Sequence, residues 1–190
     1  MLVKRETCDA CHYPVATCVC HAVTPVKSRI SITVLQHPTE AGHAKNTVRL
    51  LALLLSNVEI IVGDKGVDFS TLKERLPAET LVVYPSDGAQ SLTSLAKARR
   101  QFQHIVLLDG SWRQAKKIWL SNAWLCEFDC VTIESEAESF YIIRKAPDAS
   151  HLSTLEAAAI TLNKLDNVPL KPFYSLLDTL TNNWRKFLPQ

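Results

Sequence analysis

Glycine is scarce in this chain of 190 residues: there are five, and none belongs to a phosphate-binding pattern. The sequence contains no Gly-x-Gly-x-x-Gly and no glycine-rich loop ending in Gly-Lys-Ser or Gly-Lys-Thr. Such loops bring backbone amides close to the phosphates of a dinucleotide or a nucleoside triphosphate. We therefore do not expect a nicotinamide enzyme or a nucleoside triphosphatase. A Gly-x-Ser-x-Gly elbow is also absent, which argues against a serine hydrolase of the α/β type.

Long apolar runs are missing as well. The longest, Leu50 to Leu55, is far too short to span a bilayer, and Met1 to Thr7 carries charges where a secretory signal needs apolar residues. We expect a cytoplasmic protein with no membrane association, and nothing indicates an obligate protein partner. The composition, 47% hydrophobic and 21% charged, is that of a globular protein. A net charge of +2 is too small to indicate nucleic acid by itself.

Cysteine is concentrated at the start of the chain. Of the six cysteines, four lie in the first twenty residues, as Cys8-x-x-Cys11 and Cys18-x-Cys20. Two closely spaced thiolate pairs can complete a tetrahedron around one ion, so the pattern predicts a structural zinc site. The segment has little apolar sequence for a core of its own. We therefore expect residues 1–27 to form a zinc-binding module, and residues 28–190 a catalytic domain.

Other interpretations of these cysteines remain open. They could form disulfides, although no export signal supports an oxidising compartment, or they could be unconnected thiols. His12 or His21 could replace one cysteine as a ligand. We interpret Cys126 and Cys130 as small buried apolar residues rather than as ligands.

Beyond residue 28, apolar segments with strand character alternate with segments of helical spacing. Predicted strands cover 29–35, 58–62, 80–84, 104–108 and 130–133. Predicted helices cover 47–56, 70–75, 92–101, 111–122, 153–165 and 174–187. The strand 104–108 is nearly all apolar, which is typical of a strand covered on both faces. The fold class is therefore α/β with an open, mostly parallel sheet, whose ligands bind beyond the carboxyl ends of the strands.

One strand end carries a candidate site, Leu108-Asp109-Gly110-Ser111-Trp112. Gly110 permits a close backbone approach, and Ser111 can cap the following helix. The Asp109 carboxylate could hold a hydroxyl group or take a proton. A plain helix start beside a buried tryptophan explains the same residues equally well.

Cationic residues gather near this strand end. Arg113, Lys116 and Lys117 share one face of the helix 111–122, away from the apolar stripe of Trp112, Ala115 and Trp119. A solvated surface and a phosphate-binding surface are both open interpretations of that face. Lys97, Arg99 and Arg100 on the preceding helix add weakly to the second.

Two further clusters follow the same logic. Ser153-x-x-Glu156 is a capping box, which starts a helix and leaves backbone amides available to a ligand. The segment His37-Pro38-Thr39-Glu40, with Lys45-Asn46-Thr47, follows the first strand of the body. Whether His37 is structural or functional stays undecided at this point.

Taken together, five clusters resemble the DTW-domain family, the tRNA-uridine aminocarboxypropyltransferases. They span about residues 8 to 157 and occur in the family's order. The matching elements are Cys8-x-x-Cys11 with Cys18-x-Cys20, His37-Pro38-x-Glu40 with Asn46-Thr47, Tyr84-Pro85-Ser86, Asp109-x-Ser111-Trp112-x-x-Ala115, and Arg144-Lys145-x-Pro147 with Ser153-Thr154-x-Glu156-Ala157. The sequence departs from the family name at Ser111, where threonine is expected; both residues offer a hydroxyl group.

The resemblance implies S-adenosylmethionine as donor and a SPOUT-like fold, in which the cofactor binds at a carboxyl-terminal trefoil knot. It implies transfer of the 3-amino-3-carboxypropyl group to N3 of a tRNA uridine, with methylthioadenosine released. Asp109 is the candidate catalytic base, and its rival role is to hold the donor. The expected donor-binding residues are Asn46, Thr47, Tyr84, Pro85, Ser86, Leu108, Asp109, Gly110, Ser111, Trp112, Ala115, Leu152, Ser153 and Thr154.

For the tRNA, the expected contacts are cationic: Lys45, Arg113, Lys116, Lys117, Arg144 and Lys145. Three alternatives to this function remain. They are a methyltransferase acting on RNA, the same transfer to an rRNA uridine, and a zinc-bearing RNA-binding protein without catalysis.

Overall fold

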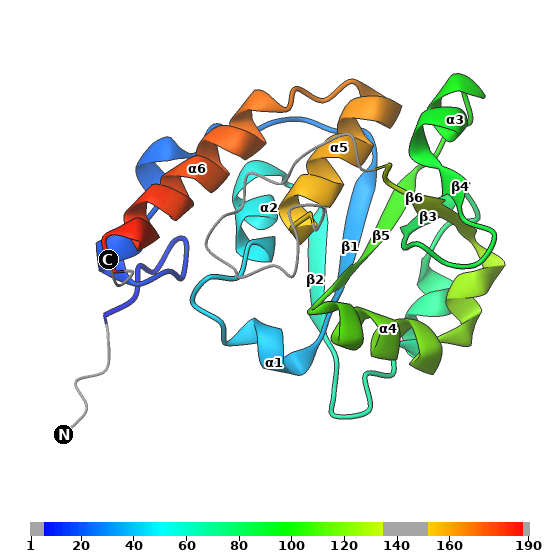
Figure 1. The fold of residues 1–190 in the computed structure, drawn as a ribbon, viewed down its shortest axis with the longest axis horizontal. Coiled ribbons are helices and arrows are strands. Elements are labelled where there is room, and N and C mark those ends of the chain that lie inside the picture. The colour runs from blue at the N-terminus through cyan, green and yellow to red at the C-terminus, as the bar shows by residue number, and fades with distance from the viewer. Residues whose placement is uncertain (1–5, 135–151, 188–190) are drawn as a thin grey trace.

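A computed structural model describes residues 6–134 and 152–187. Six strands form one open sheet in the order β2-β1-β5-β3-β6-β4, and every neighbouring pair is parallel (Figure 1). The strands are β1 (Ser31–Gln36), β2 (Val58–Val62), β3 (Thr80–Val83), β4 (Gln90–Ser91), β5 (His104–Asp109) and β6 (Asp129–Thr132). The predicted α/β class with a parallel sheet is confirmed.

Helices cover both faces of the sheet. One face carries α2 (Val48–Leu54), α5 (Thr154–Asp166) and α6 (Lys171–Arg185), which share a core with Ile32 and Leu107. The other face carries α4 (Trp112–Ser121) with the 3-10 helices η3 (Ser70–Arg75) and η4 (Ala123–Glu127), packed on Leu35 and Val106. Because side chains alternate along a strand, β5 supplies both cores, as its apolar sequence predicts.

The smaller elements complete the chain. α1 (Pro38–Ala41) follows β1, and α3 (Leu92–Lys97) follows β4. Two 3-10 helices, η1 (Val15–Thr17) and η2 (Cys20–Ala22), lie in the cysteine-rich segment. α3 is shorter than the predicted helix over 92–101, because Arg99 has a φ of 51°, which a continuing helix does not permit. In the described parts of the chain, no helix is both long and apolar enough to cross a membrane.

The strand order places a topological switch point between β1 and β5. The chain leaves β1 toward β2 over one face and leaves β5 toward β6 over the other, although β1 and β5 are neighbours (Figure 1). Such a reversal opens a space beyond the strand ends, where ligands of open α/β sheets bind. The register sets Gln36 directly beside Asp109 at this point.

The cysteine-rich segment lies against the body. Tyr13, Cys11 and Val19 are almost completely buried and belong to the same core as α2, α5 and α6. The side chain of Asn183 in α6 donates a hydrogen bond to the carbonyl of Cys18, at 3.0 Å. Apolar contacts with the body therefore help to position this segment.

Candidate functional site

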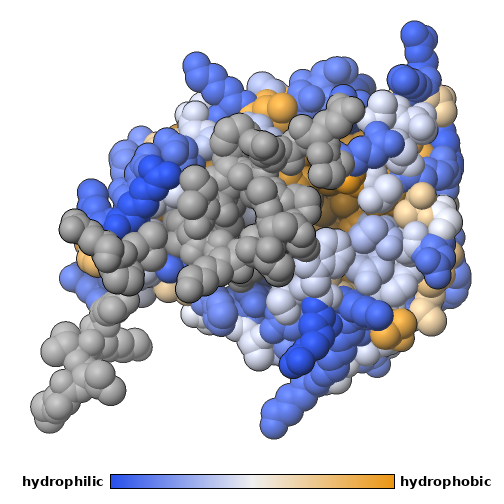
Figure 2. Space-filling model, viewed as in Figure 1, coloured by the Kyte–Doolittle hydropathy of each residue, from blue (hydrophilic) through white to orange (hydrophobic). Residues whose placement is uncertain are grey.

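A cavity opens at the carboxyl edge of the sheet, over the ends of β3, β5 and β6. Figure 2 shows an apolar hollow near the middle of the face that it displays. The cavity brings together predicted donor-binding residues from three separate segments: Tyr84, Pro85, Leu108, Gly110, Trp112, Ala115, Leu152 and Thr154. Its remaining lining was not predicted: Val83, Leu107, Val131, Thr132, Ile133 and Ala157. The lining is mostly apolar with a few polar groups, which is typical of a small-molecule site.

Two aromatic residues border this cavity differently. Tyr84 stacks on Trp119 of α4, with ring centroids 4.8 Å apart and planes 21° from parallel. Burial raises the pKa of the Tyr84 hydroxyl, so it stays a neutral hydrogen-bonding group. Trp112 keeps 51% of its surface exposed at the start of α4. The cavity is therefore bordered by the stacked ring of Tyr84 and by the exposed indole of Trp112.

The turn from β5 into α4 is tightly built. Ser111 caps the helix, and Gln114 completes a capping box by accepting a hydrogen bond from the Ser111 amide at 2.6 Å. Gly110 permits this packing, because a Cβ there would lie 2.7 Å from Cβ of Gln114. The predicted cap at Ser111 is confirmed.

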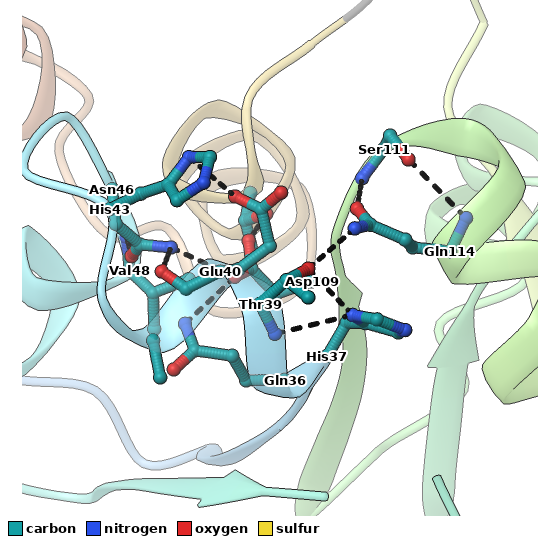
Figure 3. Close-up of polar contacts among 12 residues, drawn as sticks. Gln36, His37, Thr39, Glu40, His43, Asn46, Val48, Asp109, Ser111 and Gln114 are labelled. Carbon is teal, nitrogen blue, oxygen red and sulfur yellow. Dashed lines mark hydrogen bonds and ion pairs between the residues drawn. The ribbon is translucent and has the colours of Figure 1, made fainter. Parts of the chain in front are cut away.

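Gln114 also joins this turn to α1, the short helix that follows β1. Its side-chain amide donates to the Thr39 hydroxyl at 2.7 Å, and the same hydroxyl lies 2.9 Å from Nδ1 of His37 (Figure 3). His37 caps α1 and donates its backbone amide to the carbonyl of Asp109. These contacts give His37 a structural role, because they hold the start of α1 beside the end of β5.

Asp109 is the buried centre of the site, with 2% of its surface exposed. Its Oδ2 accepts hydrogen bonds from Gln36 at 2.8 Å and Asn46 at 3.1 Å (Figure 3), and its Oδ1 accepts one from the Thr154 hydroxyl at 2.6 Å. Three donors from three segments therefore compensate for the desolvation of this carboxylate. Asp109 does not line the cavity, but Thr154 contacts both.

Several predicted donor-binding residues lie outside the cavity lining. Asn46 and Thr47 are buried at the start of α2, and Asn46 is linked to the cavity through Asp109 and Thr154. Ser86, Ser111 and Ser153 lie beside lining residues in sequence, and Ser153 is occupied by the capping box of α5.

The cations predicted to bind RNA are divided between two regions. Arg113, Lys116 and Lys117 are exposed on α4, and Lys117 also donates a hydrogen bond to the carbonyl of Lys65. Lys45 lies over the ring of Trp184, 5.1 Å from its centre. Arg144 and Lys145, also predicted, lie outside the described residues.

The four N-terminal cysteines form one cluster. Their sulfur atoms all lie within 4.8 Å of one another, with Sγ of Cys8 3.7 Å from Cys20 and Sγ of Cys11 3.8 Å from Cys18. All are free thiols, so disulfides are not the arrangement here. Neither His12 nor His21 belongs to the cluster. These four residues could hold a metal ion.

The thiols of this cluster differ in acidity. Hydrogen bonds from the backbone of Cys11 and Ala10 lower the pKa of Cys8 to about 6. Burial and the neighbouring thiols raise the pKa of Cys20 to about 12. Of these two thiols, Cys8 is therefore the one that more readily forms the thiolate that binds a cation.

Two glutamines that position the site were not predicted. Gln36 ends an apolar strand, and nothing in that position signals a partner for a distant carboxylate. Gln114 did carry a signal, since Ser111-x-x-Gln114 has the spacing of a capping box.

These features define a parallel α/β protein with a mostly apolar cavity at the carboxyl edge of its sheet and a four-cysteine cluster near its N-terminus. Its family follows from sequence comparison. The chain belongs to the DTW-domain family, whose model, described as "DTW domain", matches residues 5–188. No solved structure matches it.

Named relatives agree with this membership. A tRNA-uridine aminocarboxypropyltransferase 2 of Drosophila melanogaster is 33% identical over 87% of this chain and 69% of its own length. The protein of that name from Mus musculus is 30% identical over 86% and 57%. A tRNA-uridine aminocarboxypropyltransferase A of Arabidopsis thaliana is 27% identical over 86% and 74%. The chain thus covers between 57% and 74% of the length of these proteins.

Proposed function

We propose that this protein is a tRNA-uridine aminocarboxypropyltransferase. It would transfer the 3-amino-3-carboxypropyl group of S-adenosylmethionine to N3 of a tRNA uridine and release methylthioadenosine. The observation that carries this proposal is the convergence of three DTW-motif segments on one cavity, in a chain whose relatives bear that name. We also propose a cytoplasmic location and a SPOUT-like arrangement of residues 28–190.

The cavity lining suits the proposed donor. Leu108, Ala115 and the stacked Tyr84 offer apolar contact to an adenine ring, and Thr154 offers a hydroxyl to a polar end. Backbone groups at Gly110 can approach a ligand closely because no side chain intervenes. The sulfonium has three carbons open to attack, so the reaction depends on which carbon is held in line with N3 of the uridine.

For Asp109, the geometry supports the holding role over that of a base. Its two carboxylate oxygens already accept three hydrogen bonds, it is 2% exposed, and it reaches the cavity through the Thr154 hydroxyl. A group that removes the proton from N3 needs to contact that atom. We therefore propose that Asp109 fixes Thr154 and the start of α5 around the donor.

Zinc suits the cysteine cluster. Four sulfurs around a tetrahedral zinc, at roughly 2.3 Å each, lie about 3.8 Å apart, and two of the sulfur pairs are separated by 3.7 and 3.8 Å. We propose that Cys8, Cys11, Cys18 and Cys20 hold a structural zinc ion in a module of residues 1–27. The exposed cations of α4 would contact tRNA phosphates near the cavity.

One experiment tests the reaction. The protein is incubated with unmodified tRNA and S-adenosylmethionine, and mass spectrometry identifies the modified nucleoside and the by-product. We expect aminocarboxypropyluridine and methylthioadenosine. A methylated nucleoside with S-adenosylhomocysteine would show a methyltransferase instead. Product on rRNA but not on tRNA would show that the acceptor is an rRNA uridine. If calorimetry detected no binding of S-adenosylmethionine, the alternative of an RNA-binding protein without catalysis would be favoured.

A further inference from the structure

We propose that Tyr13 is a positioning residue that couples the cysteine cluster to the cavity. Tyr13 lies between Cys11 and Cys18 in sequence, and none of its surface is exposed. Its backbone carbonyl accepts a hydrogen bond from the amide of Cys8 at 2.8 Å. The turn that gathers the thiols therefore also fixes the tyrosine.

The Tyr13 hydroxyl reaches out of the cysteine-rich segment. It donates a hydrogen bond to the backbone carbonyl of Asn46 at 2.5 Å. Asn46 is 1% exposed, and its side chain is held at both ends: Oδ1 accepts from the Val48 amide at 2.9 Å, and Nδ2 donates to Asp109 at 3.1 Å. A shift of the Asn46 backbone would therefore move a donor to the buried carboxylate.

The connection continues to the cavity. Asp109 accepts from the hydroxyl of Thr154, which lines the cavity and is the first residue of α5. Four hydrogen bonds, joined through the covalent structure of Tyr13, Asn46 and Asp109, thus link the backbone of Cys8 to Thr154. Each intermediate group is buried, so water does not compete for these bonds.

A tyrosine that only filled the core would not need its hydroxyl. Docking of the segment has other supports, since Arg49 donates to the carbonyl of His12 at 2.8 Å and Asn183 donates to that of Cys18. The hydroxyl adds a directed contact with the loop that holds Asp109. Where two ligands bias the same linked element, each changes the affinity for the other by the same factor. Applied to zinc and S-adenosylmethionine, this inference rests on the proposed function.

The test compares Tyr13→Phe with a matched control, Thr80→Val. Each substitution removes one fully buried hydroxyl that donates to a backbone carbonyl. Thr80 is the first residue of β3, at the amino ends of the strands and away from the cavity, and its hydroxyl donates to the carbonyl of Pro77. The first readout is the zinc affinity, measured by competition with a chelator with and without saturating S-adenosylmethionine. We expect the ligand to raise the zinc affinity about fivefold or more in the natural chain and in Thr80→Val. In Tyr13→Phe the effect should fall below about twofold.

The second readout needs no ligand. Hydrogen exchange is followed at the amide of Val48, which is bonded to Asn46, and at Val106 within β5 as a core reference. Tyr13→Phe should accelerate exchange at Val48 by about tenfold relative to Val106, and Thr80→Val should not.

The outcomes separate the two proposals. A natural chain that binds no S-adenosylmethionine contradicts the proposed function, while the exchange measurement still tests the connection through Tyr13. Unchanged exchange at Val48 in Tyr13→Phe overturns the inference. An increase in zinc affinity on S-adenosylmethionine binding that is equal in Tyr13→Phe and the natural chain also overturns it.

Discussion

The Asp109 centre and the four-cysteine cluster both gather ionisable side chains with their partners, but they differ in what satisfies those side chains. Gln36, Asn46 and Thr154 supply three hydrogen bonds to the buried carboxylate. The four sulfurs face mainly one another, and the neighbouring thiols help to raise the pKa of Cys20. The first centre is completed by the protein's own donors, whereas the second has the composition of a site completed by a cation.

Among the tests of this comparison, we expect the largest effect from removal of one proposed zinc ligand. We expect Cys11→Ser to lower zinc affinity at least about a hundredfold and to loosen residues 6–23, because binding of structural zinc contributes directly to folding. Elemental analysis and hydrogen exchange measure these changes. Cys126→Ser is the control, since that cysteine lies outside the cluster and is exposed, so its predicted burial was wrong. A natural chain without zinc but with an unchanged cysteine-rich segment would contradict the comparison.

Asp109→Asn tests the other centre. The substituted amide would direct hydrogens at Thr154 or at the amides of Gln36 and Asn46, so at least one buried donor would lose its acceptor. We expect a loss of about 2–4 kcal/mol in the free energy of unfolding, measured by urea denaturation. Asp87→Asn, at an exposed turn, should change stability by less than about 0.5 kcal/mol. Equal stability of both variants would show that the three hydrogen bonds matter little.

Acidification should affect zinc binding with a definite sign. Zinc requires thiolates, and the pKa of Cys20 is raised to about 12, so this thiol releases a proton on binding at any pH near neutrality. Each unit of falling pH should therefore weaken zinc affinity by about tenfold from Cys20 alone. Cys8, whose pKa is about 6, should add to the loss only as the pH falls through that value. Chelator competition across pH 6 to 8 measures the slope, and affinity that rises on acidification would contradict this assignment.

The smallest effect is expected at the turn beside Asp109. In Gly110→Ala the new Cβ would lie 2.7 Å from Cβ of Gln114, which would displace the capping box of α4. We expect a loss of about 1–2 kcal/mol in stability and weaker donor binding by calorimetry. Gly42→Ala is the matched control, because a Cβ at that position would meet nothing within 4 Å. If both variants behave alike, the turn is less tightly built than its contacts indicate.

The sequence predicted most of the sheet because its strands are apolar and β-branched. β2 matches the predicted range 58–62, and the apolar segment 104–108 correctly indicated a strand covered on both faces. α1 and β4 were missed, since a helix of four residues and a strand of two have little periodicity. β4 exists through its pairing with β6, which local sequence does not encode.

For the candidate site, the motif residues predicted the edge of the sheet at which the cavity lies but not the contacts among them. Asp109 was predicted as a functional carboxylate, whereas its partner Gln36 depends on the register between β1 and β5. Tyr13 similarly gives no local sign that its hydroxyl meets a residue 33 positions away. The prediction of a zinc site needed no such register, because its ligands are close together in sequence.

The contact between Asn183 and Cys18 joins segments 165 residues apart. On a ribosome that adds roughly 5–20 residues per second, α6 would emerge on the order of ten to thirty seconds after the cysteines. During that interval the four cysteines have been synthesised, but α6, which supplies Asn183, has not. An ion captured early would shield them from oxidation until synthesis reached α6, so metal supply would influence the yield of correctly assembled protein as well as its final stability.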